Sequence, residues 1–293
     1  MTPRPRRISK AWLFVAPALA VFSAFALLPI LQALRLSFFR WGGARPEAAW
    51  RGLGNYAEAF GDGVFWRAVL HNLLLAAASI MVQIPLALFL AVLLAAPLRG
   101  RWIFRTAYFA PMVLPTAVIA IFWSYALDAN GGLALPLARL LGASGEGLLG
   151  EARTAFATVF AVISWRYVGF HMVILLAGVL AVPGELYEAA ALDGAGALAR
   201  FRHVTLPGVR GALAVSALLS VVGSIKYFDL VYILTAGGPD HATELGATWI
   251  YTTGIAEGQR WGYGSALAVL LLALAMAAAV PALLARQRRE VAA

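Results

Sequence analysis

The feature that most constrains this chain is a succession of apolar blocks, each about 20 residues long or longer. A helix rises about 1.5 Å per residue, so a block of about 20 apolar residues spans the hydrocarbon core of a bilayer. Six such blocks can be drawn: 11–34, 71–96, 107–127, 155–182, 212–235 and 265–285. Charged residues make up only 13% of the 293 residues, against about 25% in soluble domains. The sequence therefore predicts an all-α, polytopic membrane protein with six transmembrane helices.

The charges between these blocks predict the topology. The two termini and the segments after the second and fourth blocks fall on one side and carry 13 basic residues against 4 acidic ones. The opposite loops carry 8 basic and 9 acidic residues. By the positive-inside rule, both termini and the segment 183–210 are cytoplasmic. The net charge of +9 is thus a topology signal and does not indicate nucleic-acid binding.

The sequence predicts one integral-membrane domain over 1–293, since no low-complexity linker divides it. The N-terminal helix 11–34 is about twice as long as a signal-peptide core and no clear cleavage site follows it, so we expect an uncleaved anchor. The core helices lie within 71–285. There is no cysteine, which excludes disulfides, thiolate metal sites and thiol catalysis.

A polar island at 183–210 interrupts the apolar pattern. Pro183 suits the first turn of a helix, so we expect a short helix over 183–192. Asp193 and Gly194 should break it, with Asp193 capping a second helix that ends near His203 and Pro207 ending the unit. Small side chains would line this helix-turn-helix elbow, with Phe201 as an apolar anchor. An ordinary alanine-rich cytosolic loop is the alternative, and composition leaves both open.

The spacing within the island resembles a known motif. Glu188-Ala189-Ala190 is followed after three residues by Gly194 and after nine more by Val204-Thr205-Leu206-Pro207. This pattern resembles the EAA loop of permease subunits in bacterial and archaeal ABC importers that use a substrate-binding protein. Further segments resemble the carbohydrate-uptake branch of the maltose and glycerol-3-phosphate type: 13–18, 52–56, 104–106 with Pro111 and Pro115, 165–170, 228–229 and 234–239. Val204 stands where the family often has isoleucine, and the loop between spans three and four lacks the large inserted domain of the maltose subunit.

The resemblance implies a type I ABC importer permease fold in the cytoplasmic (inner) membrane. It also implies partners: a second permease subunit forming a heterodimer, two cytosolic ATPase subunits, an extracytoplasmic solute-binding protein and a sugar-like substrate. The elbow would be the coupling helix seated in a groove of the ATPase. The expected ATPase-coupling residues are Glu188, Ala189, Ala190, Asp193, Gly194, Phe201, Leu206 and Pro207.

Motifs for nucleotide chemistry are missing from the chain. Its two lysines, Lys10 and Lys226, do not lie in a Gly-Lys-Ser/Thr setting, so there is no phosphate-binding Walker A loop. We therefore expect no enzymatic activity, no cofactor, and ATP hydrolysis in separate subunits. The four histidines are too scattered for a zinc-binding helix, so no metal site is expected.

Polar residues inside the spans are candidates for the substrate path. A charged side chain facing lipid at the middle of a span costs about 2.5 to 3.5 kcal/mol on the insertion scale, so these residues should face the interior. Arg166 lies between Trp165 and Tyr167, whose rings can pack on a sugar; a salt bridge to the partner subunit is the alternative. Lys226 and Asp229, three residues apart around Tyr227, should share one helix face, where they could simply pair with each other. Pro111 and Pro115 indicate a kink or an unwound cavity wall.

A stand-alone secondary transporter or channel is the alternative function. It would not need the elbow, and its coupling carboxylates would usually lie at the midplane, where this chain has only Asp229. A membrane enzyme is disfavoured, because no catalytic constellation is present. Co-purification with an ATPase would distinguish an importer permease from a stand-alone transporter or channel and from a membrane enzyme.

Overall fold

The computed structural model describes residues 11–43, 48–97, 99–133, 136, 140 and 147–291. The described chain is mostly helical, as predicted. It packs into two compact units: Met1–Asp62 with Ile250–Leu272, and Gly63–Trp249 with Ala273–Ala293. We describe each unit by itself and refer to them as the first and second units.

The first unit begins with an almost wholly exposed apolar helix. Helix α1 (Ala11–Phe22) runs through a π turn, η1 (Ser23–Leu27), into α2 (Leu28–Leu36). The segment Phe14–Leu36 has the length and composition of a membrane span, and none of its most apolar window is buried within the chain. Because exposed apolar surface is unfavourable in water, lipid or another subunit must cover this helix.

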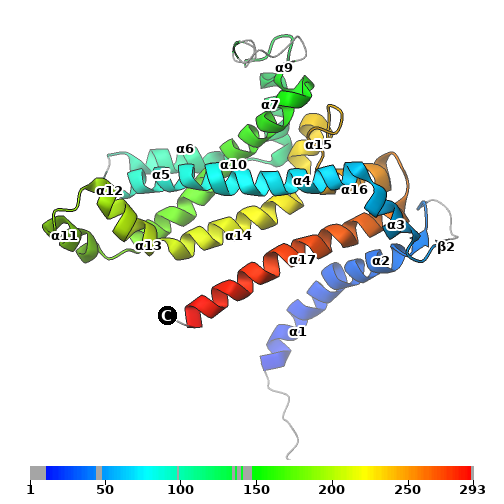
Figure 1. Ribbon diagram of the computed structural model, residues 1–293, viewed down its shortest axis with the longest axis horizontal. Coiled ribbons are helices and arrows are strands. Elements are labelled where there is room, and N and C mark those ends of the chain that lie inside the picture. The colour runs from blue at the N-terminus through cyan, green and yellow to red at the C-terminus, as the bar shows by residue number, and fades with distance from the viewer. Residues whose placement is uncertain are drawn as a thin grey trace, which may run out of the picture. The chain divides into compact units, whose positions relative to one another are not determined.

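The rest of the first unit is a short hairpin and the helices that pack on it (Figure 1). Strands β1 (Phe39–Arg40) and β2 (Ala49–Trp50) are antiparallel, with Phe39 opposite Trp50. Helix α3 (Gly54–Gly61) follows, and η4 (Thr252–Ala256) also belongs to this unit. Helices α16 (Gly246–Tyr251) and α17 (Trp261–Val291) each contain residues of both units.

The second unit is a group of helices around α10 (Figure 1). Its elements in chain order are α4 (Gly63–Ala78), the π turn η2 (Ser79–Gln83), α5 (Ile84–Ala95), α6 (Arg101–Val113), α7 (Thr116–Ala126), α9 (Gly147–Gly150), α10 (Ala152–Leu180), α11 (Gly184–Leu192), α12 (Ala197–Arg200), the π turn η3 (Phe201–Thr205), α13 (Leu206–Gly208), α14 (Arg210–Lys226) and α15 (Asp229–Thr235). Helix α10 packs along α5, α6 and α14. Its buried residues contribute to two apolar clusters, one with Ile119 and Leu230 and one with Ile84 and Val209.

Within the described part of the chain, three helices are long and apolar enough to cross a membrane: Phe14–Leu36, Gly63–Ala95 and Ala152–Leu180. Two bent helix pairs bring the number to five if each pair is one span: Arg101–Val113 with Thr116–Ala126, bent by 98°, and Ala197–Gly208 with Arg210–Lys226, bent by 67°. A shorter apolar helix covers Trp261–Ala277. Six spans therefore stay a prediction.

Two of the predicted spans are not single helices. The block 107–127 breaks at Leu114, because Pro115 disfavours helical backbone in the residue before it. The predicted kink is thus present at Pro115, whereas Pro111 lies within α6. The block 212–235 breaks between Lys226 and Asp229, where Tyr227 has an extended backbone with ψ 124°. Asp229 is the first residue of α15, where its carboxylate interacts favourably with the positive end of the helix dipole.

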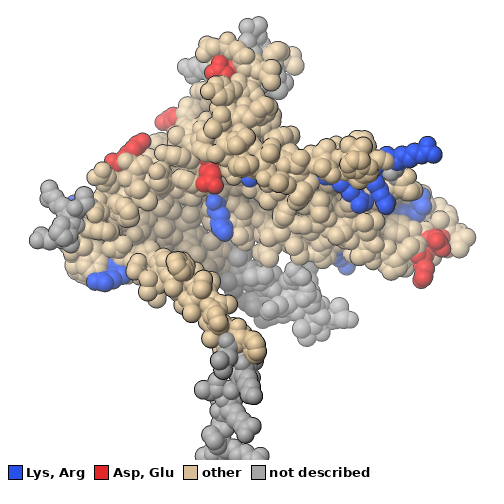
Figure 2. Space-filling view, turned by 180° about the vertical axis from the view of Figure 1, so that it is seen from behind, with Lys and Arg blue, Asp and Glu red and all other residues tan. Residues whose placement is uncertain are grey.

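Charged side chains on the surface occur in a few separate groups. Seen from behind, wide areas between these groups carry no Lys, Arg, Asp or Glu (Figure 2). Such uncharged surface is what a chain in contact with hydrocarbon requires, because charges facing lipid are costly.

Candidate functional site

The elbow between α11 and α12 forms largely as the sequence predicts. Helix α11 covers Gly184–Leu192 with Pro183 as its N-cap. Gly194 follows with φ +78°, a left-handed conformation that glycine adopts at little cost. The Ala195 amide donates to the Ala190 carbonyl at 2.9 Å and the Gly194 amide to Ala191 at 3.1 Å, which is the pattern of a Schellman motif.

Two details of the predicted elbow are wrong. Asp193 is the C-cap of α11 and does not cap the second helix, because α12 starts only at Ala197, with Gly196 as its N-cap. The second arm also does not end near His203. It continues through η3 and α13 to Gly208, because Pro207 lies near the start of α13, where a missing amide proton costs nothing.

The two arms of the elbow are tied together near the ends that lie away from the turn at Gly194. The Tyr187 hydroxyl and the buried Thr205 hydroxyl lie 3.0 Å apart and share a hydrogen bond. Phe201 is half-buried and packs against the chain's own apolar cluster around Val209. The chain then bends by 67° into α14.

Most of the expected coupling residues are accessible. Glu188, Ala189, Asp193, Gly194 and Leu206 are exposed, and Ala190, Phe201 and Pro207 are half-buried. The sequence reasoning missed two leucines on either side of the turn, Leu192 and Leu198, which are 90% and 80% exposed. A leucine in an otherwise polar island was the available signal. Nothing in the described chain covers these two apolar side chains.

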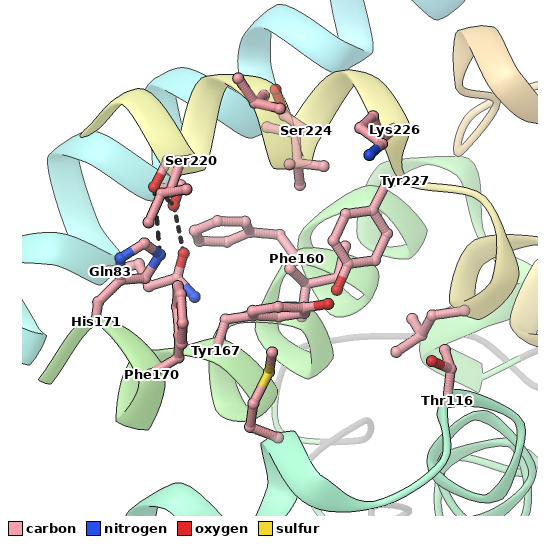
Figure 3. Close-up of a pocket in the computed structure, with 18 of the residues that line it drawn as sticks. Gln83, Thr116, Phe160, Tyr167, Phe170, His171, Ser220, Ser224, Lys226 and Tyr227 are labelled. Atoms are coloured by element: carbon pink, nitrogen blue, oxygen red, sulfur yellow. Dashed lines mark hydrogen bonds between the residues drawn. The ribbon is translucent and has the colours of Figure 1, made fainter. Parts of the chain in front are cut away.

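A cavity of about 340 Å³ lies within the second unit, between η2, α10, α14 and the break before α15 (Figure 3). Both aromatic rings and hydroxyl groups line it. Its lining includes Ser79, Gln83, Thr116, Phe160, Tyr167, Phe170, His171, Ser220, Ser224, Lys226, Tyr227, Phe228 and Asp229. The cavity thus combines flat apolar faces with hydrogen-bonding groups.

A polar cluster joins three helices at one end of the cavity (Figure 3). The Ser79 hydroxyl contacts the Gln83 amide oxygen and lies 3.0 Å from the Ser220 hydroxyl. Ser220 in turn lies 3.3 Å from Nε2 of His171. Nε2 of Gln83 and Nδ1 of His171 have no partner within the described chain. Sequence reasoning missed this cluster; the signal was the four-residue spacing of Ser216, Ser220 and Ser224, all buried on one side of α14.

Two tyrosines form the other end of the cavity. The rings of Tyr167 and Tyr227 meet edge to face at 5.7 Å, and their hydroxyls lie close together in Figure 3. Lys226 and Asp229 line the cavity and are exposed, but no ion pair joins them in the described structure. The prediction that they share one helix face is wrong, because the helix ends between them.

Arg166 and Trp165 are not part of this cavity. Arg166 is 6% exposed, and its Nη2 donates to the Leu114 carbonyl at the break between α6 and α7, at 3.3 Å. Its guanidinium also lies 5.5 Å from the centre of the Tyr167 ring. Trp165 is 40% exposed and packs on Trp123. Of the six predicted path residues, the structure therefore brings together Tyr167, Lys226, Tyr227 and Asp229.

No group of three or more His, Asp or Glu that could hold a metal ion occurs in the described part of the chain. The chemistry of the cavity is accordingly hydrogen bonding and stacking.

Known proteins resemble the chain over most of its length. A family model described as "Binding-protein-dependent transport system inner membrane component" matches residues 83–291. A probable ABC transporter permease protein of Bacillus subtilis, YurN, is 36% identical and covers 91% of this chain and 92% of its own. The trehalose/maltose transport system permease protein MalF of Thermococcus litoralis is 31% identical, covering 92% and 91%. The lactose transport system permease protein LacF of Rhizobium radiobacter is 31% identical, covering 95% and 94%.

A solved structure shares the fold. It belongs to a bacterial ABC transporter involved in the import of the acidic polysaccharide alginate, and it matches with a TM-score of 0.81 over 96% of this chain and 97% of that one. The two sequences are 21% identical.

Proposed function

Because the chain belongs to the family of binding-protein-dependent transport system inner membrane components, we propose that it is the permease subunit of an ATP-driven importer for a sugar or sugar-like solute. The names of its relatives support the substrate class, since two of them are permeases for trehalose/maltose and for lactose. The proposed assembly contains a second permease subunit, two cytosolic ATPase subunits and an extracytoplasmic solute-binding protein. ATP is hydrolysed by the separate subunits.

In the membrane, the chain has six spans with both termini cytoplasmic. Three are the continuous apolar helices, two are the bent pairs, and the sixth is the apolar part of α17. The excess of basic residues in the termini and in 183–210 supports this orientation. The elbow then faces the cytosol, on the side where ATP is available.

The exposed elbow is the observation that carries the proposal. A chain that only had to cross the membrane would not need a rigid turn with Leu192 and Leu198 almost fully in solvent. These leucines and the small residues beside Gly194 suit insertion into a groove of an ATPase subunit, since small side chains allow close approach and buried leucines add apolar contact. Glu188, Ala189, Ala190 and Gly194 are the proposed contact, with Phe201 fixing the second arm on the permease core.

The cavity is the proposed section of the substrate path in this subunit. Sugars present apolar ring faces and many hydroxyls, so a site for them needs aromatic surfaces and neutral hydrogen-bonding groups. Tyr167 and Tyr227 supply the rings, and the cluster of Ser79, Gln83 and Ser220 supplies the polar groups. Arg166 has a positioning role, because it holds the broken helix α6–α7 from outside the cavity.

Pull-down of the chain with its ATPase tests the proposal. The tagged chain should co-purify with ATPase subunits from membranes, and Leu192→Ser with Leu198→Ser should reduce the recovered ATPase at least tenfold without changing membrane insertion. Gly194→Val should act in the same direction, because a β-branched residue is strained at φ +78°. Leu53→Ser is a matched control, since Leu53 is also exposed, at 68%, but precedes α3.

Normal ATPase recovery and normal uptake in both elbow variants would overturn the assignment and favour a stand-alone secondary transporter or channel.

A further inference from the structure

A second cavity, of about 160 Å³, lies within the first unit and is lined mainly by cationic and hydrogen-bonding groups. Its lining residues are Arg40, Trp41, Gly42, Arg51, Asn55, Gln259, Arg260 and Tyr263. Three of them are arginines, and none of the lining residues that the structure describes is a carboxylate. The transport path proposed above does not use this cavity, because all residues lining that path belong to the second unit.

The charge on these arginines is only partly compensated. Glu58 bonds to two of them, with its Oε2 2.8 Å from Nη1 of Arg51 and its Oε1 2.5 Å from Nη2 of Arg260. The Arg40 side chain is exposed and has no ion-pair partner within the described residues. Each guanidinium carries five N–H donors in a planar fork, so a single carboxylate cannot pair with all the donors of three arginines. A second carboxylate, Asp62, accepts a hydrogen bond from the Tyr263 hydroxyl of the lining at 2.7 Å. Among the described residues, the charge of Arg40 therefore has no partner and its donors are unused.

The walls of this cavity are rigid. The Trp41 carbonyl accepts the Gly262 amide at 3.1 Å, and a side chain at Gly262 would collide with the Phe39 carbonyl. Gly43 has φ +83°, and a side chain there would collide with the Trp261 ring. Asn55, 1% exposed, donates to the carbonyls of Ser37 and Phe39 and accepts from Arg51 at 2.7 Å. The arginines are thus presented by a fixed frame, which lowers the entropic cost of binding a ligand.

The cavity is also placed where two apolar helices end. Arg40 and Trp41 follow shortly after α2, which completes the candidate span Phe14–Leu36. Arg260 directly precedes α17, whose apolar part is Trp261–Ala277, and its guanidinium lies 4.4 Å from the centre of the Tyr263 ring. Tryptophans and tyrosines at span ends lie at the level of the lipid headgroups. An arginine cavity at that depth faces phosphate.

We propose that this cavity binds the phosphate of an anionic phospholipid headgroup. Guanidinium groups pair with phosphate through two parallel hydrogen bonds, and a phosphate oxyanion in the cavity would satisfy Arg40 together with the free donors of Arg51 and Arg260. The lipid tails would lie along the exposed apolar side chains of α2, such as Leu31 and Leu34. A bound lipid would then link α2 to the start of α17.

Binding of short-chain lipids to the purified full-length chain in non-ionic detergent tests this proposal. We expect dihexanoyl phosphatidylglycerol to bind at least tenfold more tightly than dihexanoyl phosphatidylcholine, whose choline neutralises the phosphate charge. Arg40→Gln should remove this preference, with about a tenfold loss of affinity for phosphatidylglycerol, and should leave the fold intact because Arg40 is exposed and not bonded to Glu58. Arg99→Gln is the matched control, an exposed arginine of the second unit.

Three results would overturn the proposal. Equal affinity for the two lipids would show that headgroup charge is not recognised. An equal loss of affinity in Arg40→Gln and Arg99→Gln would reduce the effect to general electrostatics. Inorganic phosphate binding as tightly as phosphatidylglycerol would assign the cavity to a free oxyanion in place of a lipid. None of these results depends on ATPase coupling, so the proposed function can stand or fall separately.

Discussion

At the scale of single residues, Gly169 controls how closely α10 and α6 approach. A methyl group at this position would overlap the backbone carbonyl of Tyr108 and lie 2.9 Å from the Phe109 nitrogen. Backbone atoms cannot move aside as the end of a side chain can. Helix α10 would have to shift away from α6, and with it Arg166, whose hydrogen bond holds the break at Leu114.

We therefore expect Gly169→Ala to destabilise the protein by about 1 to 3 kcal/mol or more, as overpacking in a core does. The midpoint of thermal unfolding in detergent measures this. Gly211→Ala is the control, because no atom lies within 4 Å of a methyl group there and alanine favours α14. A Gly169→Ala protein as stable as Gly211→Ala would show that the two helices are free to separate.

Individual residues also show how much of the structure can be predicted from the sequence. The Asp-Gly pair at Asp193 and Gly194 predicts the elbow, because only local backbone preference is involved. The cap assigned to Asp193 is wrong, since it depends on the number of residues in the turn, which local preference does not set. The four-residue spacing of the serines indicates a polar side of α14, but the contacts of Ser220 with Ser79 and His171 depend on how three helices pack.

At the scale of helices and turns, the break between α14 and α15 changes what Lys226 and Asp229 can do. A continuous helix would place residues three apart side by side, where they could pair. The extended backbone at Tyr227 prevents that, and both side chains instead line the cavity. This break escapes sequence analysis, because the block 212–235 contains no proline that would mark it.

The two charges should therefore act independently. In a double-mutant cycle, the changes in unfolding free energy for Lys226→Met and Asp229→Leu should add to within about 0.5 kcal/mol. Uptake assays on the same three variants would show whether either charge acts on the substrate. A double variant clearly more stable than the sum predicts would reveal a pair that forms in the membrane.

The first unit is held together by a clamp with a definite pH dependence. Burial alone would raise the pKa of the Glu58 carboxyl, but its hydrogen bonds to Arg260 and Arg51, and their charges, lower this pKa below the ordinary value of 4.5. The clamp thus contributes stability that is fully present above pH 4.5 and is lost as the pH falls through the lowered pKa of the folded state.

Glu58→Gln should flatten this part of the profile. The difference in unfolding temperature between wild type and Glu58→Gln should be constant from pH 7 to 5 and shrink at lower pH. Glu257→Gln is the control, as an exposed glutamate with no ion pair within the described chain. A difference that grows on acidification would contradict the assignment.

At the scale of the whole molecule, the absence of cysteine makes the proposed path directly measurable. A cysteine at Lys226 should react with a water-soluble maleimide in the assembled transporter, because this residue is exposed and lines the cavity. Added substrate should slow that reaction several-fold. A cysteine at Arg166 should stay unreactive, since the residue is buried outside the cavity.

A cysteine at Leu53 gives the control, because it should react at a rate that substrate does not change. Substrate protection at Leu53, or its absence at Lys226, would place the path elsewhere.

Apolar length predicts the helical membrane class of the chain, since it depends only on composition along the sequence. Which charged side chain lines the cavity depends on how the helices bend and pack. Arg166 is buried outside the cavity, whereas the exposed Lys226 lines it.

The π turn at Ser79–Gln83 affects which side chains of its span face the cavity, in addition to the length of the span. Positions eight apart on an ordinary α-helix are rotated by about 80° from each other, yet Leu75, Ser79 and Gln83 all face one cavity. The wider turn absorbs that drift with one additional residue. If the same residues formed an ordinary α-helix here, the hydropathy of the span would not change, but its two halves would be rotated by about 100° relative to their present arrangement. Asn72, which bonds to the Ser224 carbonyl and the Gly246 amide, would turn away with the first half. The rotation of one half of this helix relative to the other therefore depends on the additional residue in the π turn.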